Sequence, residues 1–234
     1  MEVEKNTKIV AEKTLNNISN KKWVDKLLIF CYTILRILIM SKLYFKYGTM
    51  GSSKTADALM CRFNYIQKGF NVLLIKPSID NRFENIKESP KVISRIGISA
   101  DCIKFNTSDD LITLYNNENN KMKIDIIIVD ECQFLTTEQV EQLRQISYTT
   151  TVLCYGLLTN FKTQLFEGSK RLIEIADSIN EIKSICKCGR KASVNARFVN
   201  GKLTNQGEEI LIGAEECYES MCYWCYSHQL KNKN

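Results

Sequence analysis

The stretch Gly48-Thr49-Met50-Gly51-Ser52-Ser53-Lys54-Thr55 lies where a strand-like run gives way to a helical one. Loops of this composition present backbone N–H groups and a helix N-terminus to phosphate groups. The lysine, Lys54, reaches the β- and γ-phosphates in such a loop, and the following hydroxyl, Thr55, binds Mg²⁺. Ser53 stands where the pattern has glycine, and its Cβ opposes a positive φ. The stretch predicts a phosphate-binding loop, and a Gly/Ser turn that binds nothing is the alternative.

The residues that flank this loop favour the order strand, loop, helix. Residues 42–47 have the composition of a short strand, and residues 56–68 that of a helix. Within the helix, Leu59, Phe63 and Ile66 recur at intervals of four and three residues, so we expect them to form one apolar stripe.

A second strand is expected directly after this helix. Gly69 stands where a helix C-terminal glycine belongs. Residues 72–75 are continuously apolar, which is typical of a parallel strand covered on both faces. The sequence therefore predicts a βαβ unit and an α/β fold.

Two adjacent acids follow another apolar run. Residues 126–129 predict a buried strand that ends at Asp130 and Glu131, and ligands bind at the carboxyl ends of strands in open α/β sheets. Asp130, with Thr55, would hold Mg²⁺, and Glu131 would act as the general base. The alternative is a pair of solvated acids that cap a helix beginning near Thr136 or Thr137.

Four cysteines form two close pairs, Cys186 with Cys188 and Cys222 with Cys225. Four thiols in this arrangement suit tetrahedral zinc. Disulfides are the competing interpretation, but no signal peptide is visible, and the cytosol would keep these thiols reduced. His228 follows the last pair, and we expect it to face solvent because four cysteines already complete a zinc site.

Between the two pairs, Asn200-Gly201 is a strong signal for a two-residue hairpin loop joining strands at 196–199 and 202–204. The other cysteines are scattered, and we expect them to behave as small buried or partly buried residues. They are Cys31, Cys61, Cys102, Cys132, Cys154 and Cys217.

The order of these motifs resembles the bacterial type of thymidine kinase that carries a zinc-bound lasso domain, a family of phosphate-loop deoxynucleoside kinases. The resemblance runs from about residue 40 almost to the C-terminus. The sequence departs from the family pattern at Ser53, Asn160 and Ala214. The segments that carry the resemblance are residues 43–45, the phosphate loop, 80–83, 129–134, 153–157, 188–193, Ile212-Gly213 and Tyr218.

The resemblance implies a phosphate-loop, RecA-like parallel sheet flanked by helices, with a small zinc-binding lasso domain. It implies transfer of the γ-phosphoryl group of ATP to the 5′-hydroxyl of thymidine, giving dTMP and ADP for nucleotide salvage. Glu131 would be the base, and ATP, Mg²⁺ and structural Zn²⁺ would be the cofactors. The implied ATP and phosphate contacts are Gly48, Thr49, Met50, Gly51, Ser52, Ser53, Lys54, Thr55, Asp130, Glu131, Cys132 and Gln133.

The resemblance also implies that a lasso loop, residues 209–218, reads the edge of thymine with backbone groups. Ordinary core packing is the alternative for Phe161 and for Met50, which could line the pocket for the thymine methyl group, and a surface salt bridge with Asp80 is the alternative for Arg82. The implied substrate-binding residues are Arg82, Phe161, Ile212, Gly213 and Tyr218.

The motifs divide the chain into four expected parts. Residues 40–180 would form the kinase domain, 181–228 the lasso domain and 229–234 a tail. Residues 1–39 precede the resemblance and are expected to be disordered or to reflect translation from an upstream start codon. A signal-anchor fragment or a helix docked on the core remains an alternative, although the apolar run at 27–40 is too short for a confident membrane span.

The chain has 234 residues and a net charge of +6, enough length for one α/β domain and a small zinc module. No basic stripe interleaved with aromatic residues stands out, so we expect no nucleic-acid partner. We expect no membrane partner either, because the apolar run at 27–40 is too short for a confident span. The resemblance implies a cytoplasmic homotetramer that acts on thymidine, with deoxyuridine left open. Two other functions remain open: a nucleotide sensor with impaired catalysis, and a zinc-ribbon ATPase that depends on nucleic acid.

Overall fold

The computed structural model describes residues 42–80, 89–207 and 218–231. The chain divides into two units, residues 1–40 and 41–234, and the described residues all belong to the second. The expected N-terminal extension, 1–39, therefore lies outside the described residues. None of the described helices is long and apolar enough to cross a membrane.

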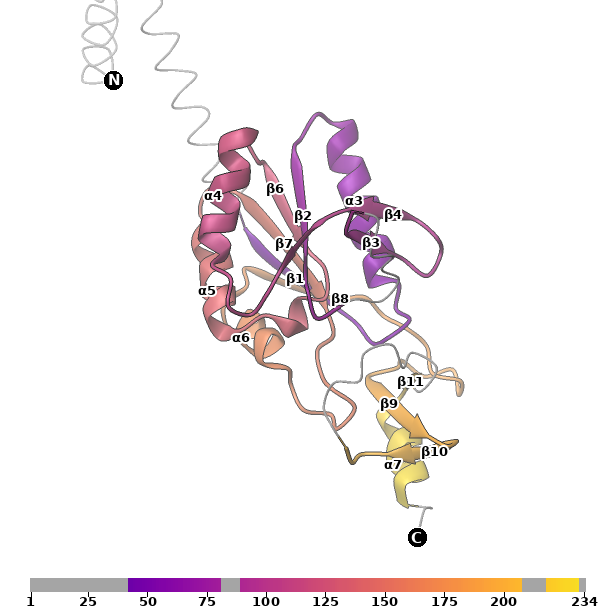
Figure 1. Cartoon of the computed structure of the whole chain (residues 1–234). Coiled ribbons are helices and arrows are strands. Elements are labelled where there is room, and N and C mark those ends of the chain that lie inside the picture. Colours follow the sequence, from indigo (N-terminus) through magenta and orange to yellow (C-terminus); the bar gives the residue numbers. More distant parts are fainter. Residues whose placement is uncertain (1–41, 81–88, 208–217, 232–234) are drawn as a thin grey trace, which may run out of the picture. The chain divides into compact units, whose positions relative to one another are not determined.

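A six-stranded parallel sheet forms the centre of this unit, with the strand order β5-β2-β6-β7-β1-β8 (Figure 1). Its strands are β1 (Leu43–Tyr47), β2 (Val72–Pro77), β5 (Ile103–Phe105), β6 (Ile126–Val129), β7 (Thr151–Gly156) and β8 (Ser178–Glu181). The βαβ prediction is confirmed, although β6 and β7 lie between β1 and β2.

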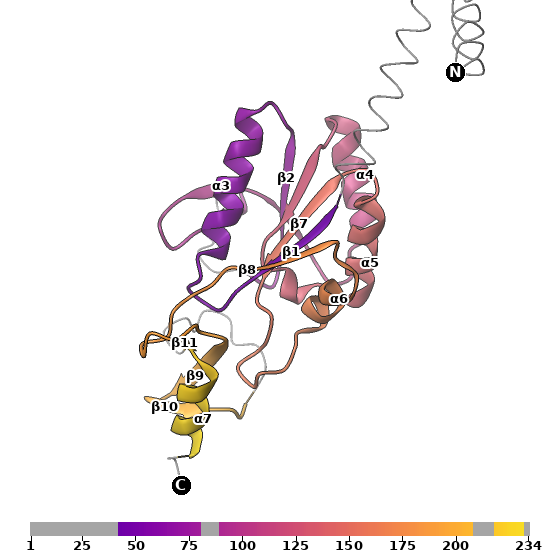
Figure 2. The ribbon, with the colours of Figure 1, turned by 180° about the vertical axis from the view of Figure 1, so that it is seen from behind.

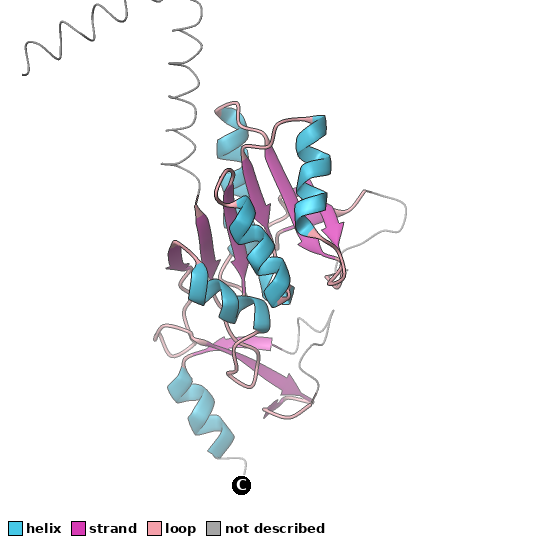
Figure 3. Ribbon diagram, turned by 90° about the vertical axis from the view of Figure 1, so that its left-hand side faces the viewer, coloured by secondary structure: helices cyan, strands magenta, loops and turns pink. Residues whose placement is uncertain are grey.

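Helices cover both faces of the sheet, as an α/β fold requires because its parallel strands are apolar on both sides. In Figures 1 and 2, α3 lies on one face, and α4, α5 and α6 lie on the other. Figure 3 looks onto the second face. The helices are α3 (Lys54–Gln67), α4 (Leu111–Lys121), α5 (Thr137–Ile146) and α6 (Glu167–Ile175), and a short 3₁₀ helix η1 spans Cys132–Phe134.

Two hydrophobic cores result, because alternate residues of a strand point to opposite faces. In β6, Ile127 and Val129 pack in the core beneath α4, α5 and α6, whereas Ile126 and Ile128 pack in the core beneath α3. A short antiparallel hairpin, β3 (Lys91–Ile93) and β4 (Ser99–Asp101), adds Val92 to the second core.

Helix α3 ends as the sequence predicts, but its expected apolar stripe is wrong. Gly69 has φ +81, and the N–H groups of Gly69 and Phe70 donate to Ile66 and Tyr65, which is the Schellman arrangement. Leu59 is buried, yet Phe63 is 60% exposed and Ile66 is 40% exposed. The helix instead packs on the core through a neighbouring face, on which Ala58 and Leu59 are buried and Cys61 and Tyr65 are partly buried.

A smaller three-stranded sheet, in the order β10-β9-β11, and helix α7 (Tyr223–Lys231) make up the C-terminal module. The predicted hairpin is confirmed: β9 (Val194–Val199) and β10 (Lys202–Thr204) flank Asn200 and Gly201, both of which have positive φ. Such a pair forms a type I′ turn. The third strand is β11 (Tyr218–Met221), and α7 continues three residues beyond the boundary expected at 228.

Candidate active site and metal centre

The backbone of the phosphate loop follows β1 and begins α3. Gly51 and Ser53 have positive φ values of 73 and 64. A Cβ on Gly48 would lie 2.5 Å from the carbonyl oxygen of Ile182, so this position admits only glycine without a shift. Ser53 adopts the left-handed conformation, at the position where the sequence pattern has glycine.

Lys54, Thr55 and Asp130 meet at the carboxyl edge of the sheet. Lys54 is buried, and its Nζ donates to the carbonyl oxygen of Thr49 at 2.8 Å. The Thr55 hydroxyl donates to Asp130 Oδ2 at 3.1 Å. The structure thus brings together the hydroxyl and the carboxylate that the sequence predicts for Mg²⁺.

Burial, and next the neighbouring Glu131 carboxylate, raise the pKa of Asp130 to about 7, while the Thr55 hydroxyl and Lys54 oppose the increase. Asp130 is 4% exposed, so the alternative of a solvated acid is wrong for this residue. A carboxylate that is costly to ionise when buried becomes favourable beside a cation.

Glu131 has a left-handed backbone, with φ 53 and ψ 39 at the start of η1. Its carboxylate accepts a hydrogen bond from the amide of Gln133, whose Oε1 in turn accepts from the N–H of Leu157 at 3.0 Å. Gln133 is 2% exposed. A buried amide therefore links Glu131 to the residue after β7, and the strained backbone is typical of functional positions.

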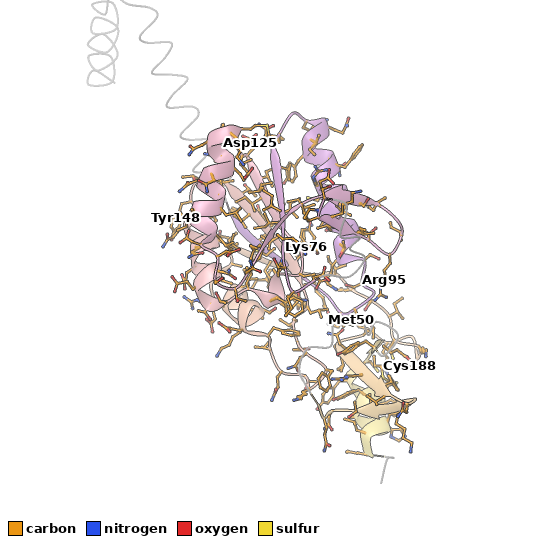
Figure 4. The ribbon with its side chains drawn as sticks, in the orientation of Figure 1. Met50, Lys76, Arg95, Asp125, Tyr148 and Cys188 are labelled. Atoms are coloured by element: carbon orange, nitrogen blue, oxygen red, sulfur yellow. The ribbon has the colours of Figure 1, made fainter. Side chains whose placement is uncertain are left out.

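The four cysteines converge in the C-terminal module, where their sulfur atoms all lie within 4.8 Å of one another. Cys188 is labelled in Figure 4. The N–H of Cys225 donates to Cys222 Sγ at 3.4 Å, and such hydrogen bonds lower the pKa of Cys222 to about 6. Contacts with Cys188 and then Cys222 raise the pKa of Cys225 to about 12. Four thiolates this close together repel one another, and a single cation that prefers sulfur ligands would stabilise all four.

The remaining cysteines and His228 behave as expected where they are described. Cys132 and Cys154 are buried, and Cys61 and Cys102 are partly buried. His228 is exposed and stacks on Trp224, with ring centroids 5.0 Å apart. Cys31 and Cys217 lie outside the described residues.

Two of the expected substrate contacts lie at the junction of the sheet and the C-terminal module. Phe161 is 1% exposed, and the Arg197 guanidinium lies 4.9 Å above its ring. Tyr218 begins β11 and pairs with Arg197 across the ladder. Arg82, Ile212 and Gly213 lie outside the described residues.

Sequence reasoning missed the side chains of the C-terminal module that reach the phosphate loop. The N–H of Met50 donates to Asn195 Oδ1 at 2.7 Å, and the Ser220 hydroxyl donates to the carbonyl oxygen of Met50. The hydroxyl groups of Thr49 and Ser184 also form a hydrogen bond. These partners are more than a hundred residues apart and belong to no local motif, so no signal in a single sequence could have identified them.

A parallel sheet with a phosphate loop after its first strand and an acidic pair after β6 defines the class of phosphate-loop nucleotide-binding proteins. Within that class, the family profile described as thymidine kinase matches residues 41–226. The chain belongs to the thymidine kinase family.

Curated relatives agree with this assignment. The thymidine kinase of Rhodopirellula baltica is 44% identical over 186 residues, covering 78% of this chain and 86% of that protein. The thymidine kinase of Shewanella oneidensis is 42% identical and covers 78% and 95%, and that of Haemophilus influenzae is 40% identical and covers 81% and 98%. Among solved structures, the Pif1 helicase of Candida albicans aligns with a TM-score of 0.35 and 10% identity over 66% of this chain and 38% of that chain, too weak a similarity to inform the fold or function.

Proposed function

We propose that this protein transfers the γ-phosphoryl group of ATP to the 5′-hydroxyl of thymidine, producing dTMP and ADP. The observation that carries the proposal is the meeting of Lys54, Thr55 and Asp130 beside Glu131, in a chain of the thymidine kinase family. Phosphoryl transfer asks a protein mainly to position groups and to neutralise charge. An alcohol is the acceptor, so the enzyme is a phosphotransferase that supplies DNA precursors by salvage.

The phosphate loop fits a nucleoside triphosphate. Ser52 Oγ is buried and has no hydrogen-bond partner in the described part of the chain, so it is an unsatisfied group at the centre of the loop. Lys54 would exchange its bond to the Thr49 carbonyl for the β- and γ-phosphates. Mg²⁺, when bound, neutralises phosphate charge, and Thr55 and Asp130 would hold it.

Glu131 would accept the proton of the attacking hydroxyl. Its hydrogen bond from Gln133 fixes the direction of the carboxylate, and Gln133 is fixed in turn by the N–H of Leu157. A base held by a buried partner loses little entropy when the substrate arrives, which is the advantage of a preorganised site.

Cys186, Cys188, Cys222 and Cys225 would hold structural Zn²⁺. Their geometry is compatible with tetrahedral coordination. The metal would stabilise the module that carries the lasso loop, residues 209–218, which includes Ile212 and Gly213 and would read the thymine edge.

The remaining substrate contacts, the oligomeric state and the domain bounds are proposed from family membership. Arg82, Phe161 and Tyr218 would contact substrate or phosphate, and the functional protein would be a cytoplasmic homotetramer without a nucleic-acid partner. Residues 40–180 and 181–228 would act as kinase and lasso domains, although β8, which crosses this boundary, pairs with the main sheet. Light scattering on the purified full chain measures the oligomeric state, and a monomeric mass would contradict the homotetramer.

The test is phosphoryl transfer from ATP to a panel of common nucleosides in the presence of Mg²⁺, with deoxyuridine included. We expect dTMP to be the main product. Folded, zinc-loaded protein that binds ATP but phosphorylates none of the nucleosides would contradict the proposal and favour a nucleotide sensor. ATP hydrolysis that is stimulated by a polynucleotide would favour the ATPase.

A further inference from the structure

The peptide groups at Met50 are held on both sides by the C-terminal module. Asn195 accepts a hydrogen bond from the Met50 N–H at 2.7 Å, and Ser220 donates to the Met50 carbonyl oxygen. Met50 is labelled in Figure 4, on the side of the parallel sheet that meets β9 and β11. We refer to Asn195 and Ser220 as the Met50 clamp.

The clamp is a built feature of the small sheet. Asn195 in β9 and Ser220 in β11 are direct partners in the antiparallel ladder, so the two side chains rise from neighbouring positions. Asn195 is 3% exposed, and its Nδ2 donates to the Thr159 carbonyl oxygen at 2.9 Å. Both polar atoms of the Asn195 amide therefore have hydrogen-bond partners. A flipped amide would place its Nδ2 against the Met50 N–H and its Oδ1 against the Thr159 carbonyl oxygen, so only one orientation fits.

The clamped residue begins the part of the loop that must approach phosphate. Gly51 and Ser53, just beyond it, both hold positive φ, and just before it the Thr49 carbonyl accepts from the Ser52 N–H and from Lys54. A non-glycine residue in the left-handed region persists only when surrounding contacts impose it. Fixing both polar groups of Met50 supplies such a contact at the start of the turn.

We propose that Asn195 and Ser220 are positioning residues that preorganise the phosphate loop, so that the cysteine-bearing module sets the affinity for the nucleotide as well as contacting the nucleoside. This inference rests on the proposed function for the identity of the nucleotide. It gives the C-terminal module a role at the site that binds ATP, the phosphoryl donor. A phosphate loop that the module already holds in order loses less entropy when the nucleotide binds.

The experiment compares Ser220→Thr with Ser220→Val in the full-length, zinc-loaded protein. Threonine and valine are nearly equal in size and both suit a strand, but only threonine keeps the hydroxyl that donates to Met50. The measurement is the dissociation constant of ADP by titration calorimetry, together with zinc content and melting temperature, to show that both variants are folded.

We expect S220T to bind ADP as the wild type does and S220V to bind about fivefold more weakly, the effect of losing one hydrogen bond. In the kinase assay, S220V should raise KM for ATP more than KM for thymidine. Asn195→Ala, which removes the other half of the clamp, should also weaken ADP binding. Equal ADP affinities in S220T and S220V, or a loss confined to thymidine, would overturn the inference.

The ADP titration needs no catalysis, so the two proposals fail separately. A protein that binds ADP but phosphorylates no nucleoside would remove the proposed function, and the threonine–valine comparison would still decide the clamp. A working thymidine kinase with identical ADP affinities in both variants would keep the function and remove the clamp.

Discussion

Ser53 has a Cβ in a left-handed backbone conformation, where glycine is the residue without steric cost. It is exposed, and no side-chain hydrogen bond caps α3 there. We predict that Ser53→Gly raises the free energy of unfolding by about 1 kcal/mol, measured by urea denaturation. Ser53→Ala is the matched control, because it removes the hydroxyl but keeps the Cβ. Equal stability of the glycine and alanine variants would show that the Cβ costs nothing.

Asp130 makes the nucleotide-free protein less stable as pH rises. Burial raises its folded pKa from 3.8 to about 7, so between these values the folded state keeps a proton that the unfolded chain has released. The free energy of unfolding therefore falls as pH increases through this range. We predict that Asp130→Asn is stabilising, and that its advantage is about 1–2 kcal/mol larger at pH 8 than at pH 5.5. An advantage that is independent of pH would contradict this electrostatic origin.

At the residue scale, the sequence predicted what local motifs determine. The convergence of Thr55 and Asp130 follows from a phosphate loop and an acidic strand end at one edge of a parallel sheet. The bond from Gln133 to Glu131, and that from Asn195 to Met50, depend on side-chain directions and on chain segments brought together only by folding. A single sequence contains no periodic signal for either.

At the scale of elements, Gly156 ends β7 against η1. A Cβ there would lie 2.6 Å from Gln133 Oε1 and 2.7 Å from Cys132 Sγ. Because η1 carries Gln133, a shift that relieves this clash would also move the partner of Glu131. We predict that Gly156→Ala lowers the free energy of unfolding by about 2–3 kcal/mol and also lowers kcat.

Gly97 provides the control for this prediction. It has φ +86, and a Cβ there would meet nothing within 4 Å, so Gly97→Ala should cost about 1 kcal/mol, for the backbone conformation alone. Urea denaturation of both variants measures the difference. Equal losses would mean that η1 moves away from Gly156 without cost.

The predicted elements were most accurate where the chain is continuously apolar or where a turn demands particular residues. The strand at 126–129 and the hairpin at Asn200-Gly201 have the expected bounds and loop. The stripe on α3 failed because the helix has a second set of residues at helical spacing, Ala58, Cys61 and Tyr65, and this set faces the core in place of Phe63 and Ile66. Phe63 and Ile66 lie on the exposed side of the helix.

At the scale of the whole molecule, the C-terminal module has a small core of its own. Two of the four clustered cysteines, Cys186 and Cys222, belong to that core. Modules of this size depend on metals or disulfides for stability. We predict that chelation of zinc exposes the amides of β9, β10 and β11 to hydrogen exchange, while the amides of β1, β6 and β7 stay protected.

The matched variants are Cys222→Ser, which should reproduce the effect of chelation, and Cys61→Ser, which lies in α3 and should retain zinc. Hydrogen exchange followed by mass spectrometry resolves the two sheets. Unchanged protection in β9 to β11 after complete loss of metal would mean that the module folds without it.

The measurement that tests the central claim most directly compares the wild type with Glu131→Gln, which preserves the size of the side chain but removes the base. The quantity is the rate of dTMP formation from thymidine and saturating ATP, with the ADP dissociation constant measured on the same samples. The account predicts that E131Q forms dTMP at least about 100-fold more slowly while binding ADP with nearly unchanged affinity. Normal dTMP formation by E131Q, or none by the wild type, would contradict it.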